Sequence, residues 1–352
     1  MSATLFSQTQ LLPPISRFYP IRKTSTAASS SVLTGASKPI PLASDQSPKT
    51  ESEFESNIET NAALRWKDPP PASIPGTYIS LAKARLAALV VLTTMAGYAV
   101  CPLATSLPTL LATTVGTALC VASANSLNQW IEAPYDAQMN RTRSRVLVTH
   151  SISPIHAFSF GIASGIAGFV SLYALVNPIT AVLGLANIVL YAGIYTPMKR
   201  FSIWNTWVGS LVGAIPPIMG WTACTGTIDA GALFMGAILF AWQFPHFNAL
   251  SWNLRSDYSK AGYHMMCVVD PALNGRVSLR YALALIPLCA SAPAIGLTSW
   301  MFVATSSVVN GIFAMAAYRF WRNSNEKTAR ELFFMSLIHL PALLALVMIF
   351  KL

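Results

Sequence analysis

Two carboxylates and an asparagine recur at four-residue spacing within the stretch Asn125–Leu147, which follows a long apolar run. If this stretch is helical, Asn128, Glu132 and Asp136 share one face of the helix. Hard oxygen ligands suit Mg²⁺, which binds proteins through one or two carboxylates and keeps waters or substrate phosphates as its other ligands. The spacing therefore predicts a magnesium-diphosphate site. The structural alternative is an intrahelical cluster of ion pairs that ends the apolar helix.

Cations follow these carboxylates directly in the chain. Arg141 and Arg145 are again four residues apart and could hold phosphate oxygens through paired N–H groups. Pro134 lies between the two acids and removes a backbone donor. We therefore expect the helix to end near Glu132, with Asp136 on an irregular segment that lines a polar cavity.

A second group of polar residues lies in the stretch His246–Met266. Its acid is Asp257, and Arg255 and Lys260 are cations that could bind phosphate. Two such groups could hold a diphosphate between them through Mg²⁺, with cations neutralising the leaving group as a carbon–oxygen bond breaks. We expect Asp257 to oppose the first group across the site.

The composition requires a membrane domain to position these groups. The chain has 352 residues, of which 53% are hydrophobic and only 10% charged, whereas soluble domains carry about 25% charged residues. The five cysteines form no CxxC pair, which argues against structural zinc, iron–sulfur clusters and a disulfide framework. In a membrane protein the net charge of +10 indicates orientation signals in the loops rather than nucleic-acid binding.

The hydropathy pattern predicts an all-α membrane protein with nine transmembrane helices. The predicted spans are roughly 79–101, 107–127, 154–175, 177–195, 204–222, 230–250, 278–297, 299–318 and 331–350. Lys and Arg occur in the loops after the second, fourth, sixth and eighth spans and not in the loops between them. By the positive-inside rule, these basic loops and the N-terminus face the same side. The loop after the fourth span holds Lys199 and Arg200, which contact substrate or only orient the chain.

The first residues differ in composition from the rest of the chain. Residues 1–44 contain four basic residues, many Ser and Thr, and no acid, which is typical of a mitochondrial transit peptide. A generic disordered tail is the alternative. Residues 45–78 indicate a disordered linker and pre-helix segment, and residues 79–352 the transmembrane domain. We expect a multi-pass protein of the mitochondrial inner membrane, with its N-terminus and polar loops facing the matrix.

Three motifs in this order resemble the UbiA intramembrane prenyltransferase superfamily, and within it the mitochondrial members that modify haem. They are NQWIEAPYDAQMNRT, YTPMKR and HFNALSWNLRSDYSKAGYHMM, and the resemblance covers about residues 79–350. It implies a nine-helix prenyltransferase bundle that transfers the farnesyl group of farnesyl diphosphate to the 2-vinyl group of haem B, making the precursor of haem A for cytochrome oxidase. It also implies Mg²⁺ as cofactor, haem B as substrate, and proteins of haem A synthesis or oxidase assembly as candidate partners in the lipid bilayer.

The resemblance and the chemistry together suggest a role for each polar residue. Four residues would act in catalysis and hold Mg²⁺, and six would bind the diphosphate. The first group is Asn128, Glu132, Asp136 and Asp257, and the second is Arg141, Arg145, Lys199, Arg200, Arg255 and Lys260.

The acceptor haem needs apolar walls and could take an axial ligand from the protein. His246 borders the second polar group, and imidazole is a usual haem ligand. His156 is a weaker candidate, and Tyr195 and Trp252 could line the porphyrin or prenyl pocket. A histidine satisfied within the bundle and an interfacial aromatic belt are the structural alternatives.

Two other functions share part of this pattern. A polyprenyltransferase acting on an aromatic quinone precursor would share the first polar group but should have more acids in the second. A haem or lipid transporter would also place polar groups inside a bundle, but transporters usually place broken helices near the midplane. Here the charges gather at one membrane face, which favours an enzyme acting on a lipid substrate.

Overall fold

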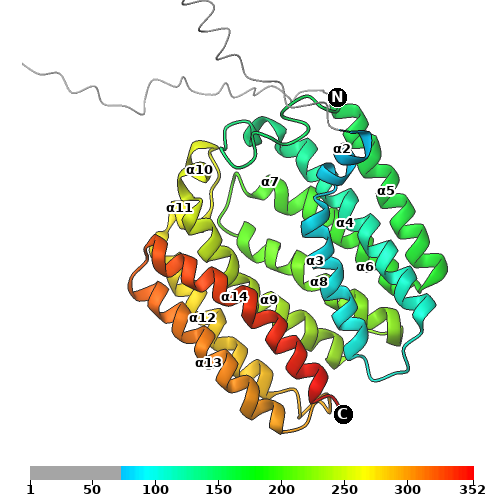
Figure 1. Ribbon diagram of the computed structural model, residues 1–352, viewed down its shortest axis with the longest axis vertical. Helices are drawn as coiled ribbons and strands as arrows, with labels where there is room; N and C mark the ends of the chain where they lie inside the picture. The colour runs from blue at the N-terminus through cyan, green and yellow to red at the C-terminus, as the bar shows by residue number, and fades with distance from the viewer. Residues whose placement is uncertain (1–72) are drawn as a thin grey trace, which may run out of the picture. The chain divides into compact units, whose positions relative to one another are not determined.

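The computed structural model describes residues 73–352, which form an all-helical bundle (Figure 1). Its first half comprises α2 (Ile74–Leu81), α3 (Ala84–Val100), α4 (Leu107–Asp136), α5 (Pro154–Leu175), α6 (Pro178–Ile188), the π-helix η2 (Val189–Tyr195) and α7 (Thr196–Met198). Its second half comprises α8 (Asn205–Thr225), α9 (Ala230–Asn253), α10 (Arg255–Lys260), α11 (Met266–Val269), α12 (Pro271–Ala290), α13 (Met301–Arg322) and α14 (Glu326–Ile349). The predicted transit peptide and most of the predicted linker lie outside the described residues, although helical structure already begins at Ile74.

The prediction of a helical membrane bundle is confirmed. Within residues 73–352, seven segments are long and apolar enough to cross a membrane, or eight if α2 and α3, which meet at a bend of 53°, count as one span. The remaining predicted span, the seventh, corresponds to α12, whose first half carries Arg276 and Arg280. That helix occupies 271–290 rather than 278–297, because Asp270 accepts a hydrogen bond from the N–H of Leu273 and Pro271 takes its first position.

Capping side chains mark the first turns of several helices. The third and fourth predicted spans divide at Asn177–Pro178, as expected, because the side chain of Asn177 caps α6 by accepting a hydrogen bond from Thr180. α5 and α14 begin in the same way, at Ser153 and Asn325. Helix packing follows chain order closely, with α4 against α5, α8 against α9, and α12 against α13.

The packing of α3 against α8 joins segments that are far apart in the chain. Glycine permits this contact, because a β-carbon on Gly220 would lie 1.8 Å from the carbonyl oxygen of Thr94. One on Gly97 would lie 2.1 Å from the carbonyl oxygen of Pro217. Small residues of this kind allow close helix packing in membranes, where apolar burial alone does not drive helices together.

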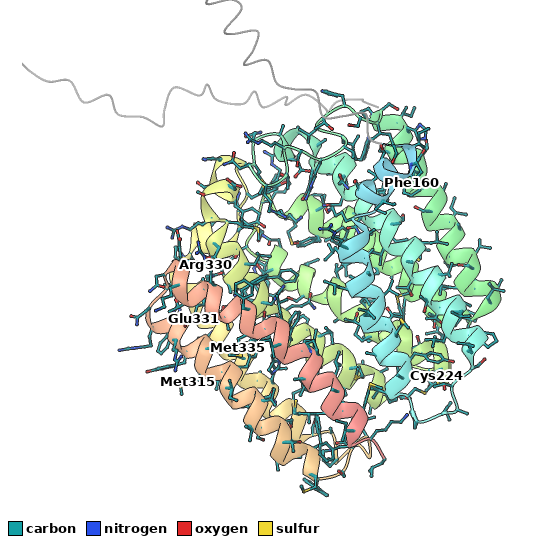
Figure 2. The ribbon with its side chains drawn as sticks, in the orientation of Figure 1. Phe160, Cys224, Met315, Arg330, Glu331 and Met335 are labelled. Atoms are coloured by element: carbon teal, nitrogen blue, oxygen red, sulfur yellow. The ribbon has the colours of Figure 1, made fainter. Side chains whose placement is uncertain are left out.

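The bundle has two distinct ends. Figure 1 shows α2, α7 and α10 towards one end and the C-terminus at the other. In Figure 2, Phe160 marks the first end, beside α2, and Cys224 marks the second, at the end of α8. The ring of Phe160 packs against that of Tyr78 on α2, with centroids 5.0 Å apart. The end marked by Phe160 is called the polar end below, and the end marked by Cys224 the opposite end.

Candidate functional site

The polar face of α4 forms the centre of the candidate site. Asn128, Glu132 and Asp136 are 1%, 5% and 2% exposed, and they lie on successive turns of one helix. The prediction that α4 would end near Glu132 is wrong, since the helix continues through Pro134 to Asp136. Proline removes its own N–H bond, but the residues after it can still donate, as Ala137 does to the carbonyl of Ala133. The uninterrupted helix keeps both acids on one face.

Two cations from other segments pair with these carboxylates. The Nζ of Lys199 lies 2.7 Å from one Glu132 oxygen, and Arg145 Nη1 lies 3.5 Å from the other. The same Arg145 nitrogen also donates to Asp136. Burial alone would lower the pKa of Lys199, but the Glu132 carboxylate raises that pKa well above its ordinary value. The lysine therefore remains charged at neutral pH.

Lys199 reaches Glu132 from the end of α7, the short helix that follows a π-helix. η2 leads into α7, and the hydroxyl of Thr196 donates to the carbonyl of Tyr191, 2.8 Å away. The same hydroxyl accepts from Asn128 Nδ2 at 3.0 Å, so this segment is bonded to the polar face of α4. π-Helical segments are rare and occur often at functional sites. Here the segment brings the YTPMKR motif to the acids.

Lys83 is a site residue that the sequence did not reveal. It lies between α2 and α3 with φ of 50°, in the left-handed region that non-glycine residues rarely occupy. Its Nζ donates to Asn128 Oδ1 at 2.7 Å. In the sequence it is a single lysine at the start of an apolar span, which is typical of an interfacial residue. Only the bend between the helices turns its side chain to the site.

Amides on α4 hold this bend in place. Gln129 Nε2 donates to the carbonyl of Leu81 at 2.7 Å, and Asn125 Nδ2 donates to that of Ala82 at 3.0 Å. These carbonyls belong to the break between α2 and α3. Backbone groups freed by a broken helix need partners inside a membrane, and these two amides supply them.

The structure brings the second predicted group to the first. Asp257, on α10, accepts from the backbone N–H of Arg141 at 3.4 Å and from Asn140 Nδ2 at 3.5 Å. It therefore lies against the loop that follows α4. Arg255 and Lys260 are exposed at the same end, and the guanidinium of Arg255 lies 4.8 Å from the ring centroid of Trp252.

Both cations of the YTPMKR motif, Lys199 and Arg200, also contact aromatic rings. Arg200 donates to the hydroxyl of Tyr135, and its guanidinium carbon lies 4.3 Å from the centroid of that ring. The ammonium of Lys199 lies 4.4 Å from the centroid of Tyr195. Tyr195 is therefore beside the carboxylate cluster. Trp252 instead contacts Arg255.

The two candidate histidines lie on other helices and are not brought to the acids. His246 stacks on Trp242 and Phe333, with centroids 4.6 Å and 5.0 Å away, and its Nδ1 lies 2.7 Å from Ser336 Oγ. His156 Nε2 lies 2.6 Å from the hydroxyl of Tyr78. Each histidine thus has one partner in the bundle and one ring nitrogen without a described bond.

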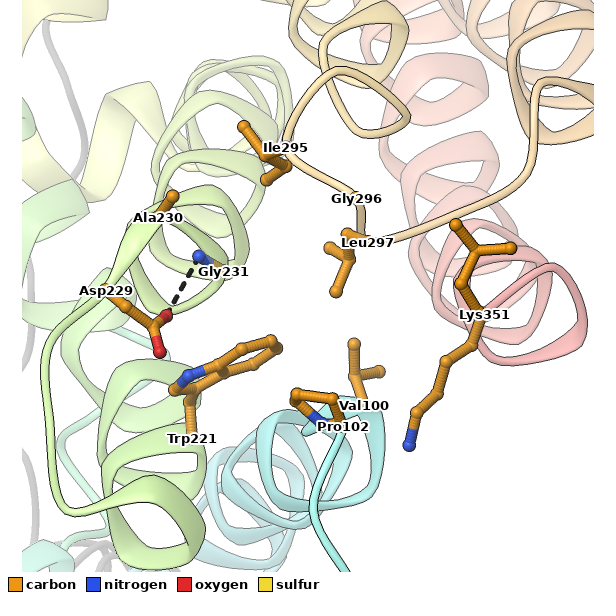
Figure 3. A pocket seen from close by; sticks show the side chains of 11 residues that line it. Val100, Pro102, Trp221, Asp229, Ala230, Gly231, Ile295, Gly296, Leu297 and Lys351 are labelled. Carbon is orange, nitrogen blue, oxygen red and sulfur yellow. Dashed lines mark hydrogen bonds between the residues drawn. The ribbon is translucent and has the colours of Figure 1, made fainter.

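A cavity of about 330 Å³ opens beside the carboxylates. Its lining includes three cations, Lys83, Arg141 and Arg145, with Ser80 and Gln129. A second cavity of about 250 Å³ lies at the opposite end, between Trp221, Asp229 and Lys351 (Figure 3). The first is lined by an excess of positive charge and adjoins two acids, so it can bind a polyanion together with a divalent cation.

No set of three or more His, Cys, Asp or Glu side chains within residues 73–352 is arranged to bind a metal ion by itself. The donors at the site are two carboxylates and an amide oxygen on α4, with Asp257 on α10. This set fits Mg²⁺, which needs few protein ligands when substrate phosphates and waters complete its shell. It does not fit a cage that holds metal without substrate.

Comparison with known proteins assigns this bundle to a class. Residues 90–338 match the UbiA prenyltransferase family. The solved structure of digeranylgeranylglyceryl phosphate synthase has a TM-score of 0.67 at 13% identity, covering 78% of this chain and 96% of that one. A UbiA homolog from Archaeoglobus fulgidus bound to DMAPP and Mg²⁺ has a TM-score of 0.57 at 14% identity, covering 77% and 99%. The chain belongs to the UbiA prenyltransferase family.

A more specific likeness lies within that family. The chain is 48% identical over 303 residues to the mitochondrial protoheme IX farnesyltransferase of Homo sapiens, covering 86% of this chain and 68% of that protein. That of Yarrowia lipolytica is 45% identical over 318 residues, with the same coverage. Together with the apolar helices, these relatives define a mitochondrial multi-pass membrane prenyltransferase.

Proposed function

We propose that this chain transfers the farnesyl group of farnesyl diphosphate to the 2-vinyl group of protoheme IX, making haem O. One observation carries the proposal. Cations from three other segments, Lys83, Arg145 and Lys199, bond to the buried polar face of α4 beside a cavity. The choice of farnesyl and haem is supported by relatives that are named for this reaction.

The α4 carboxylates and Asp257 are suited to hold Mg²⁺ with the diphosphate. Asn128, Glu132 and Asp136 would supply oxygen ligands from one helix face, and Asp257 would supply one from α10. Bound there, Mg²⁺ would neutralise charge on the diphosphate as the carbon–oxygen bond breaks. In the structure Glu132 and Asp136 are instead paired with Lys199 and Arg145. Those cations can exchange a carboxylate partner for a phosphate oxygen when substrate enters.

The cations divide into two sets by depth. Lys83, Arg145 and Lys199 lie partly buried around the acids, where electrostatic interactions are strong. Arg141, Arg200, Arg255 and Lys260 are exposed at the same end. The inner set would bind the diphosphate, and the outer set would attract it from the aqueous side.

The apolar bundle accounts for the remaining chemistry. Loss of diphosphate leaves an allylic cation, which the vinyl π-bond of the acceptor attacks to form the new carbon–carbon bond. Water then adds at the other vinyl carbon and releases a proton, which gives a hydroxyethylfarnesyl group. Helices that exclude water until the carbon–carbon bond forms would prevent simple hydrolysis.

Tyr195, His246 and His156 are the candidate residues of the acceptor site. Tyr195 adjoins Lys199 and could form a wall of the porphyrin pocket. His246 has a ring nitrogen without a described bond and could bind the haem iron from α9, with His156 as the alternative. Replacing His246 by alanine should remove any shift of the haem absorption spectrum that binding produces, whereas replacing His156 should not.

The orientation follows from the charges of the loops. The loops that carry Arg141, Lys199 and Arg255 all lie at the polar end, so the site would face the matrix by the positive-inside rule. Protease treatment of mitoplasts compared with intact mitochondria tests this. Cleavage of the 137–153 loop in mitoplasts, which lack the outer membrane but keep an intact inner membrane, would contradict a matrix-facing site.

Complementation tests the proposed reaction. The chain should restore haem O, measured by chromatography of extracted haems, in cells that lack their own activity. Glu132→Gln should fail at equal protein level. A folded chain that makes no haem O but prenylates an aromatic quinone precursor would be a quinone-type polyprenyltransferase. One that moves haem without modifying it would be a transporter.

A further inference from the structure

Tyr263 has a buried hydroxyl group that no described residue satisfies. The side chain is 4% exposed, and its hydroxyl is the only tyrosine hydroxyl in residues 73–352 that is buried without a hydrogen-bond partner. Buried hydroxyl groups are nearly always paired, because leaving one unpaired loses its hydrogen bond to water. The residue lies in the loop between α10 and α11, next to the candidate site.

The backbone around Tyr263 fixes its position. Gly262 has φ of 70° and ends α10 in a left-handed turn. The N–H of Gly262 donates to the carbonyl of Ser259 at 3.2 Å, and that of Tyr263 donates to the carbonyl of Tyr258 at 3.0 Å. This pair of bonds is the Schellman motif, and the rings of Tyr258 and Tyr263 form its usual apolar contact, 6.0 Å apart.

The next residue ties the loop to the site itself. The N–H of His264 donates to the carbonyl of Lys199 at 2.8 Å, and Asn205 Nδ2 donates to the carbonyl of His264 at 3.1 Å. Because the side chain of Lys199 binds Glu132, Tyr263 is held between α10 and the segment that approaches the acids. Its ring also packs edge-on against Tyr135, which holds Arg200.

The charged groups that act on this hydroxyl are those of the candidate site. They are Glu132, Lys199, Asp136 and Arg145. Burial raises the pKa of Tyr263, so the hydroxyl keeps its proton and remains a hydrogen-bond donor at neutral pH. None of the four groups bonds to it. The hydroxyl therefore lies in the electrostatic field of the site with a proton to donate.

We propose that Tyr263 is a substrate-binding residue whose hydroxyl donates a hydrogen bond to the diphosphate group of the prenyl donor. This inference rests on the proposed function. The hydroxyl that no described residue satisfies supplies this bond. The bond becomes stronger as the leaving diphosphate gains charge, so it aids cleavage of the carbon–oxygen bond as well as binding.

Tyr263→Phe tests the proposal, since it removes one oxygen and keeps the ring contacts. With the purified full chain and Mg²⁺, dissociation constants are measured for farnesyl diphosphate and for inorganic diphosphate, with the thermal unfolding midpoint of each protein. Both dissociation constants should rise roughly 10- to 100-fold, the range for a hydrogen bond to a charged group. The unfolding midpoint should stay the same or rise, because an unpaired buried hydroxyl is removed.

A matched control is Thr117→Val, which removes another buried hydroxyl without a partner. Thr117 lies on α4 about 22 Å along the helix from Glu132, given a rise of about 1.5 Å per residue. It should preserve or raise the unfolding midpoint and leave both dissociation constants unchanged. A purely structural role for Tyr263 would make both variants behave alike.

The possible outcomes separate the two proposals. If the wild type binds farnesyl diphosphate and Tyr263→Phe binds each ligand as tightly as the wild type does, the inference is overturned and the proposed function stands. If the wild type itself binds no farnesyl diphosphate, the proposed function fails, and this inference fails with it.

Discussion

Charged side chains at the two ends of the bundle are used differently. At the opposite end, Asp229 accepts from the N–H groups of Gly231 and Ala232 at the start of α9 (Figure 3). Lys351 donates to the carbonyls of Ala99 and Cys101 at the end of α3. Each charge there stabilises a helix terminus, which is where the helix dipole favours it.

At the polar end the charges instead bind one another across helices. Lys83, Lys199 and Arg145 converge on the polar face of α4, and further cations surround them. Helix capping does not need this arrangement, and burying several charges together is costly. The costly burial of several charges together, rather than charge alone, is the reason for placing the proposed ligand site at the polar end.

The largest expected difference between the ends comes from their acids. If Asp136 is a metal-diphosphate ligand as proposed, Asp136→Asn should reduce haem O formation about a thousandfold, because charge develops at that site during the reaction. Asp229→Asn keeps a capping side chain and should change the rate less than twofold. Rates are measured on purified protein with saturating Mg²⁺. Equal effects of the two substitutions would remove the distinction between the ends.

The next largest difference is expected between Lys199 and Lys351, in both stability and rate. Lys199→Met breaks the buried pair with Glu132 and should lower the free energy of unfolding by about 3 kcal/mol and the rate at least tenfold. Lys351→Met removes only contacts with a helix terminus, worth about 0.3–1 kcal/mol, and should leave the rate unchanged. Denaturant titration and turnover measure these effects. If Lys351→Met lowers the free energy of unfolding as much as Lys199→Met does, the charged contacts at the two ends contribute equally to stability, which contradicts this comparison.

Lys83 and His150 both have left-handed backbone conformations, so glycine substitutions at the two positions can be compared directly. Lys83→Gly relieves the left-handed conformation, which costs about 1–2 kcal/mol in other residues, but removes the ammonium group. The Michaelis constant for farnesyl diphosphate should rise about tenfold with little loss of stability. His150, with φ of 55°, is the matched control. His150→Gly should stabilise the protein without changing the Michaelis constant, and a tenfold change there would count against a role for the Lys83 charge.

The smallest effect is expected for the cap of α9. Asp229→Ala removes the side chain that caps the helix and should lower the free energy of unfolding by about 1 kcal/mol. The Michaelis constant and the rate should stay at wild-type values, because this carboxylate contacts only backbone N–H groups in the structure. Thermal unfolding and steady-state kinetics provide the readouts. A change in the Michaelis constant would mean that the opposite end contributes to substrate binding.

The amino-acid sequence alone determined the class of fold and the central residues. Apolar runs of spanning length, separated by loops of alternating charge, predicted the bundle, and the four-residue spacing of Asn128, Glu132 and Asp136 predicted their shared face. The expectation that a proline ends a helix was wrong at one position. Pro134 did not end α4, because one missing N–H bond near the end of a helix costs less than the contacts that the last turn makes with Arg145 and Thr142.

Tertiary structure decided which groups meet. A single lysine in an apolar span and a tyrosine after a glycine carry no signal of function in the sequence. Lys83 reaches Asn128 because α2 and α3 meet at a bend whose carbonyls accept from amides of α4. The loop of Tyr263 lies against Lys199 because a Schellman turn ends α10 and the carbonyl of Lys199 accepts from the N–H of His264. Periodicity reports which residues share a face of one helix. Contacts between helices depend on bends, turns and close packing, which only the folded chain brings together.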